Sequence, residues 1–175
     1  ALGYLVGALT SPFLMRKITV GRFFLWACLI TGLFLMLSGF TGDTFVLFVY
    51  RVLAGVASAW IFVAGGVLIS QLAHLNPTHS GLLLGIFYGG PGFGIVLCSL
   101  FLPEIISYAT ESRWTHAWQF GWLGLAAVCG LMTVLLAKPV LSIPAIPTRS
   151  DSHIGTPLRR YALVLAGYFM FGVGY

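Results

Sequence analysis

The chain alternates between long apolar runs and short polar segments. Five runs are apolar almost throughout and a sixth begins near the carboxyl end; they cover Ala1–Met15, Phe23–Phe40, Thr44–Leu72, Gly81–Leu102, Trp118–Ala137 and Tyr161–Tyr175. A helix needs about 20 mainly apolar residues to cross a bilayer. The pattern therefore predicts a series of transmembrane helices. The first and last runs are shorter, and we expect each to be part of a helix that continues beyond this sequence.

Composition turns this pattern into a class of protein. Hydrophobic residues make up 59% of the chain and charged residues only 7%, whereas a soluble domain has about 25% charged residues. The sequence therefore predicts an all-α, polytopic transmembrane helix bundle. We expect the bundle to occupy residues 1–137, a Pro/Ser/Arg linker residues 138–160, and the start of another spanning helix residues 161–175.

The basic residues fall mainly on one side of the predicted membrane. That side carries seven of them: Arg16, Lys17, Arg22, Lys138, Arg149, Arg159 and Arg160. The opposite side carries Arg113 with the acidic residues Asp43, Glu104 and Glu111. By the positive-inside rule the seven-residue side is cytoplasmic. This places the linker in the cytoplasm and the predicted polar loop Pro103–Ala117 outside, and it explains the net positive charge without a nucleic-acid partner.

Arg51 is the one charged residue in the third run. An Arg at the centre of a membrane helix costs roughly 2.5 to 3.5 kcal/mol and usually faces a protein interior or a water-filled cavity. Gly55 and Ser58 follow it at helical spacing, so they are expected on the same face, and Tyr88 is a further candidate for the wall of such a cavity. A snorkelling Arg is the alternative, because the run spans about 42 Å against about 30 Å of hydrocarbon.

Two stretches resemble motifs of the major facilitator superfamily. Arg51-Val-Leu-Ala-Gly55-Val-Ala-Ser-Ala59 is similar to the R-x-x-x-G-x-x-x-A pattern of the family's fourth helix, where the Arg lies in the central cavity. The second stretch is similar to the family's G-P-x-x-G-G motif in the fifth helix, with Ile95 in place of the final Gly. Its candidate packing and bending residues are Gly85, Gly89, Gly90, Pro91 and Gly94. Of the family's cytoplasmic loop motif, only the pair Gly21-Arg22 remains, and Ile18 stands at the position of its Asp.

The resemblance covers nearly the whole chain as helices two to six and the start of helix seven, and it is greatest to the YbfB/YjiJ-like branch. It implies the N-terminal half of a transporter with about twelve helices in two halves, in the inner membrane of a bacterium. It further implies a small-molecule substrate, proton coupling and a C-terminal half that completes the cavity. The four carboxylates all lie outside the predicted spans. Arg51 is therefore expected to meet a carboxylate elsewhere in the protein, backbone carbonyls near Pro91, or an anionic group of the substrate.

Other classes of function have less support in the sequence. A non-transporting membrane scaffold or assembly subunit would account equally well for the packing glycines. An enzyme is not expected, since no nucleophile, base and orienting residue are grouped. No cofactor or metal is expected either: His74 and His79 lack a third ligand nearby, and the three cysteines lie far apart within apolar runs.

Overall fold

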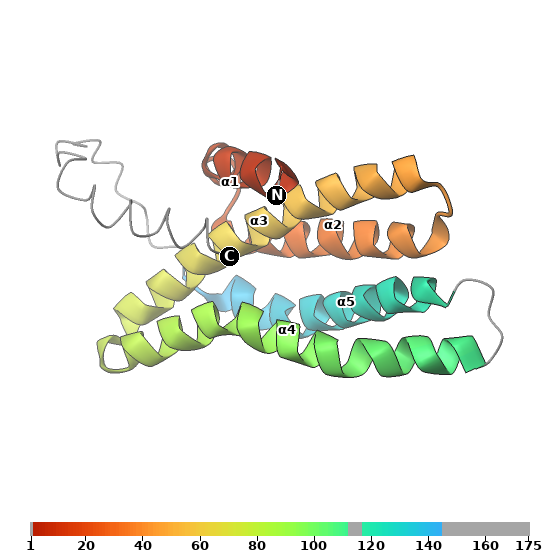
Figure 1. The fold of residues 1–175 in the computed structure, drawn as a ribbon. Coiled ribbons are helices and arrows are strands. Elements are labelled where there is room, and N and C mark those ends of the chain that lie inside the picture. The colour runs from red at the N-terminus through yellow and green to blue at the C-terminus, as the bar shows by residue number, and fades with distance from the viewer. Residues whose placement is uncertain (1, 112–116, 145–175) are drawn as a thin grey trace, which may run out of the picture. The chain divides into compact units, whose positions relative to one another are not determined.

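The computed structural model describes residues 2–111 and 117–144, and this part of the chain is helical (Figure 1). Its elements, in order, are α1 (Leu2–Met15), α2 (Val20–Phe40), α3 (Thr44–Leu75), the short 3₁₀ helix η1 (Pro77–His79), α4 (Ser80–Glu111) and α5 (Trp118–Ser142). Helices α2, α3, α4 and α5 are long and apolar enough to cross a membrane, α4 together with η1, and α1 is a shorter apolar helix. The predicted all-α transmembrane bundle is confirmed.

Several helices extend past the apolar runs that predicted them. Helix α2 begins at Val20, so Arg22 lies in its first turn, and α3 continues to Leu75. Helix α5 continues past Ala137 through Pro139 to Ser142. The predicted boundaries followed the change from apolar to polar residues, whereas backbone hydrogen bonding continues for a turn or so beyond that change. The predicted linker beyond residue 144 and the start of the next span at 161–175 lie outside the described residues.

The predicted loop Pro103–Ala117 is wrong in its first part, because α4 continues through Pro103 to Glu111. A proline in a helix removes one backbone hydrogen bond, and for this reason the sequence predicts the end of the span at Pro103. Here the residues after Pro103 keep a helical apolar spacing. Ile106 packs over Gly121 of α5, and Ala109 is buried. This packing against α5 stabilises the carboxyl-terminal part of α4 despite the proline.

Asp43 caps the amino end of α3. Its carboxylate accepts hydrogen bonds from the backbone N–H groups of Phe45, at 2.7 Å, and Val46, at 3.2 Å. The first N–H groups of a helix have no partner within the helix, and an Asp at this position satisfies them. Asp43 stands directly before the third apolar run, a position at which Asp is a favoured helix cap. The cap fixes the level at which α3 begins.

Helix α1 packs against α3 through residues that have almost no side chain. Gly3 lies against the backbone of Val52 and Gly7 against that of Val56, so closely that a Cβ at either glycine would clash. Ser11, the next small residue at the same spacing, is fully buried. One turn beyond Val56 on α3, Trp60 donates a 3.0 Å hydrogen bond from Nε1 to the hydroxyl of Thr10 on α1. The contacts advance together along both helices, so α1 and α3 run parallel.

Helix α2 packs against α5 in the opposite sense. A Cβ at Gly21 would lie 3.0 Å from the carbonyl oxygen of Val140, and one at Gly39 would lie 2.9 Å from the Leu123 side chain. Between these ends, the Cys129 thiol donates to the carbonyl of Cys28 at 3.5 Å. The partner on α5 moves back along the chain as α2 advances, so the two helices are antiparallel, as Figure 1 shows.

Candidate functional site

The guanidinium of Arg51 lies on the face of an aromatic ring. Arg51 extends from α3 toward α5, where its Cζ atom lies 3.5 Å from the centroid of the Trp122 ring. A cation over an indole face is attracted by the negative charge of the ring's π system. The Nε and Nη2 atoms of Arg51 are buried and have no hydrogen-bond partner among the described residues. The side chain is therefore stacked on one face and unsatisfied along one edge.

The position of Arg51 along α3 sets its depth in the membrane. Helix α3 has 32 residues, which corresponds to about 48 Å, and Arg51 follows Thr44 by seven residues, or about 10 Å. If α3 is centred in about 30 Å of hydrocarbon, the Arg51 backbone lies only about 1–2 Å inside the boundary. A snorkelling Arg at this depth would turn its whole guanidinium to water. Protein atoms instead cover Nε and Nη2, which favours a site inside the protein.

The other residues predicted around Arg51 face different surroundings. A Cβ at Gly55 would lie 3.5 Å from the backbone nitrogen of Tyr4, so Gly55 faces α1, whereas Arg51 reaches α5. Ser58 is exposed. Helical spacing predicted that Gly55 and Ser58 lie on the same face of α3 as Arg51. In the structure this face packs against α1 at Gly55 and is exposed at Ser58.

Tyr88 lies in an aromatic cluster at a different level. Its ring centroid is 5.2 Å from that of Phe87 and 6.0 Å from that of Phe62. Phe62 follows Arg51 by 11 residues on α3, a rise of about 16 Å. The structure therefore does not bring Tyr88 and Arg51 together. The Tyr88 side chain is 57% exposed, so one side of this cluster is open.

The glycines of the predicted helix-five motif are on an open face of α4. At Gly85, Gly89, Gly90 and Gly94, an added Cβ would meet no described atom within 4 Å. The helix continues through Pro91 without a break. These residues were predicted to allow close helix packing and bending. Within residues 2–111 and 117–144 nothing packs against them, and their role stays a prediction.

The loop-motif pair divides into a packed residue and an exposed one. Gly21 lies tightly against Val140, where α2 and α5 meet at the predicted cytoplasmic side. Arg22 is exposed. The glycine thus has a packing contact that explains why a residue without a side chain stands there, while Arg22 contributes to the positive charge of that side.

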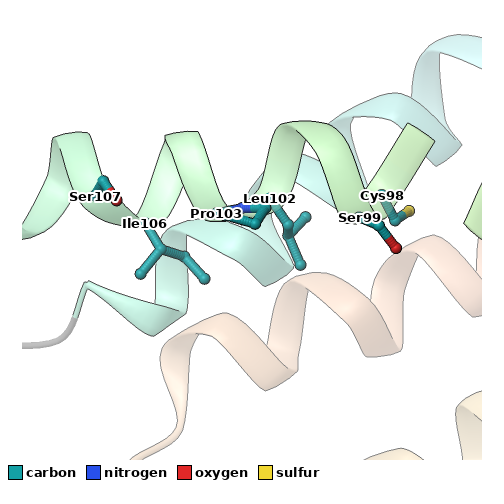
Figure 2. Close-up of a pocket in the computed structure, with 6 residues that line it drawn as sticks. All are labelled: Cys98, Ser99, Leu102, Pro103, Ile106 and Ser107. Atoms are coloured by element: carbon teal, nitrogen blue, oxygen red, sulfur yellow. The ribbon is translucent and has the colours of Figure 1, made fainter. Parts of the chain in front are cut away.

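A hollow of about 600 Å³ lies elsewhere on α4, lined by Cys98, Ser99, Leu102, Pro103, Ile106 and Ser107 (Figure 2). Leu102 and Ile106 project from one side of the helix, toward Gly121 of α5. The Ser99 hydroxyl donates to the Ile95 carbonyl of its own helix at 2.8 Å. The lining is mostly apolar and carries no charge, so we place the candidate site at Arg51 and Trp122 instead.

No carboxylate in the described part of the chain forms a salt bridge with Arg51. Asp43 caps α3, and Glu104 and Glu111 are exposed residues in the carboxyl-terminal part of α4. The group that pairs with Arg51 stays a prediction.

Sequence reasoning missed Trp122 and the glycines of α1. Trp122 had no local signal, because its contact with Arg51 joins two helices that are far apart in the sequence. The glycines of α1 had one. Gly3, Gly7 and Ser11 recur every fourth residue, the spacing at which membrane helices approach closely.

Comparison with known protein families gave a match over the whole chain. Residues 1–175 match the model of the family described as "Uncharacterised MFS-type transporter YbfB". No curated protein and no solved structure matched the chain.

Proposed function

The chain belongs to this family of major-facilitator-type membrane transporters, and from that membership we propose that it moves a small anionic solute by alternating access, coupled to protons. Transporters built from such halves bind their substrate near the interface of the halves and rock around it. Arg51 provides the positive charge at the binding site. The membrane is the inner membrane of a bacterium.

The unsatisfied guanidinium of Arg51 is the observation that supports an anionic substrate. A buried donor without an acceptor costs roughly 1–3 kcal/mol, and more when it is charged. Nε and Nη2 are two such donors in the described part of the chain. A solute that supplies acceptors removes this cost, so the free energy of binding favours an anion over a neutral molecule of the same shape.

Coupling to protons requires a group that gains and loses a proton during the cycle. Among the described carboxylates, Asp43 and Glu111 lie at helix ends and Glu104 lies two turns before the end of α4. We therefore propose that a carboxylate in another part of the full-length protein titrates, and that its protonation state decides whether it competes with the substrate for Arg51. The scaffold alternative predicts neither uptake nor a role for the charge.

Uptake by the full-length protein in proteoliposomes tests the proposal. The probes are radiolabelled lactate, succinate and gluconate, with glucose and lysine as neutral and cationic comparisons, measured with and without an inward proton gradient. Arg51→Ala is expected to reduce anion uptake by at least about 10-fold, since hydrogen bonds to charged groups contribute roughly 1.5–3 kcal/mol. Arg51→Lys keeps the charge but loses the fork of donors, and we expect it to be intermediate.

Arg16 provides the matched control. It also lies beside an aromatic ring, with its Cζ atom 5.9 Å from the Phe13 centroid, but it is exposed between α1 and α2. Arg16→Ala and Arg16→Lys are expected to keep anion uptake near the wild-type level. Full uptake by both Arg51 variants would refute the role of Arg51, and absence of uptake for every probe in the wild type would favour the scaffold.

A further inference from the structure

We propose that Arg51 and Trp122 form one carboxylate-binding site, in which the indole covers a face of the guanidinium and the Nε–Nη2 edge receives both carboxylate oxygens. This inference rests on the proposed function and deepens it by naming the chemical group recognised. It assigns Trp122 as a positioning residue, since it acts through Arg51.

The first observation that supports a carboxylate is which two Arg51 nitrogens lack a partner. In a guanidinium, Nη2 is trans to Cδ across the Nε–Cζ bond, so the Nε–H and one Nη2–H point in the same direction. These two atoms are the buried donors without a partner in the described residues. Two parallel N–H groups match the two oxygens of a carboxylate, which is the usual bidentate pairing of Arg.

The second observation is the position of the Trp122 ring, which restricts where an acceptor can bind to Arg51. With Cζ 3.5 Å from the ring centroid, one face of the guanidinium is closed to any ligand. Acceptors must then approach in the guanidinium plane, and at the Nε–Nη2 edge they must displace the protein atoms that cover these two nitrogens here. The ring also holds that plane at a fixed angle, which reduces the rotamer entropy lost when a carboxylate binds.

Charge favours a carboxylate over a phosphate. Apart from Arg51, the basic residues of the described helices are near their ends, namely Arg22, His74, His79 and Lys138. One guanidinium neutralises one negative charge, and a phosphate dianion would keep a net charge that is costly away from water. The carboxylate can belong to a substrate or to an acidic side chain of the full-length protein, and the experiment separates these two sources.

The experiment is NMR of the arginine Nε–H groups in ¹⁵N-arginine-labelled, full-length protein in nanodiscs. The Arg51 signal is identified by its loss in Arg51→Lys. The ring current of the indole is expected to shift this signal upfield, and Trp122→Leu removes the shift, while Trp122→Phe keeps part of it. Lactate is then expected to move the signal downfield, as hydrogen bonding to a carboxylate does, and lactamide is expected to leave it in place.

Each outcome decides a different point. A signal that is already downfield and insensitive to lactate would support carboxylate recognition but assign it to the protein's own side chain. A signal that neither lies downfield nor responds to lactate overturns the carboxylate site. A signal unchanged by Trp122→Leu overturns the role of Trp122. None of these readings depends on uptake, so failure here is distinguishable from failure of the proposed function.

Affinity for lactate, measured from the same titration, gives the quantitative test. Trp122→Leu is expected to weaken lactate binding about 5- to 30-fold, the range that corresponds to a partly desolvated cation–π contact. Trp122→Phe is expected to restore most of it. The matched control is Trp26→Leu, because Trp26 is 61% exposed on α2; it should leave both the signal and the affinity unchanged. A loss as large in Trp26→Leu as in Trp122→Leu would contradict a specific role.

Discussion

At the scale of single residues, the close contact between α1 and α3 depends on residues of α1 that have little or no side chain. Gly7 places its Cα where the backbone of Val56 passes, and a Cβ there would also lie 2.8 Å from the Cβ of Ala59. Lipid tails are as apolar as the side chains, so membrane helices gain from close van der Waals contact rather than from leaving water. The small residues of α1 make that closeness possible.

Gly7→Val is therefore expected to destabilise the bundle by about 1–3 kcal/mol, the usual cost of overpacking. Thermal unfolding of the full-length protein in detergent measures this as a lower midpoint temperature. Gly130→Val is the matched control, since a Cβ at Gly130 on α5 would meet no described atom within 4 Å. Equal midpoints for the two variants would contradict the packing seen at Gly7.

At the scale of elements, hydrophobic runs predicted each described α-helix but not every helix end. The sequence shows where a helix meets lipid, because lipid selects apolar residues. It does not show whether a polar continuation stays helical, because that depends on neighbours such as the α5 surface under Ile106. The pairing of Arg51 with Trp122 was out of reach for a related reason: it joins residues from two runs whose contact no local pattern records.

The beginning of α3 is a case where local chemistry suffices, and it makes a prediction at this scale. Asp43→Ala removes the acceptor for the N–H groups of Phe45 and Val46 and is expected to cost about 1 kcal/mol. Asp43→Asn keeps a side-chain oxygen at the same place and is expected to cost much less. Denaturation midpoints of the two variants, measured in the same detergent, check this. If Asn is as destabilising as Ala, the capping interpretation is wrong.

At the scale of the whole molecule, the distribution of charge predicts the orientation, and the fold makes this testable. Gly42 lies exposed between α2 and α3, on the predicted outer side, and Thr78 lies exposed between α3 and α4, on the predicted inner side. Cysteines at these two positions report the side directly, once Cys28, Cys98 and Cys129 are replaced by Ala.

Gly42→Cys is expected to react with a membrane-impermeant maleimide on intact cells, whereas Thr78→Cys is expected to react only after the membrane is permeabilised. The reason is the excess of Lys and Arg on the side of Arg16 and Lys17, which is retained in the cytoplasm during insertion. The opposite labelling pattern would reverse the orientation. Labelling of both positions from outside would contradict an odd number of crossings between them.

The depth of Arg51 has an electrical consequence. If α3 is centred in the bilayer, an anion that reaches Arg51 from the predicted outer side crosses only about a twentieth of the hydrocarbon layer, about 1–2 Å of about 30 Å. A unit charge moved through the full membrane potential exchanges about 2.3 kcal/mol per 100 mV. Binding from outside would then hardly sense the voltage, and the electrical work on the anion, less what the coupled protons offset, would fall on the steps after binding.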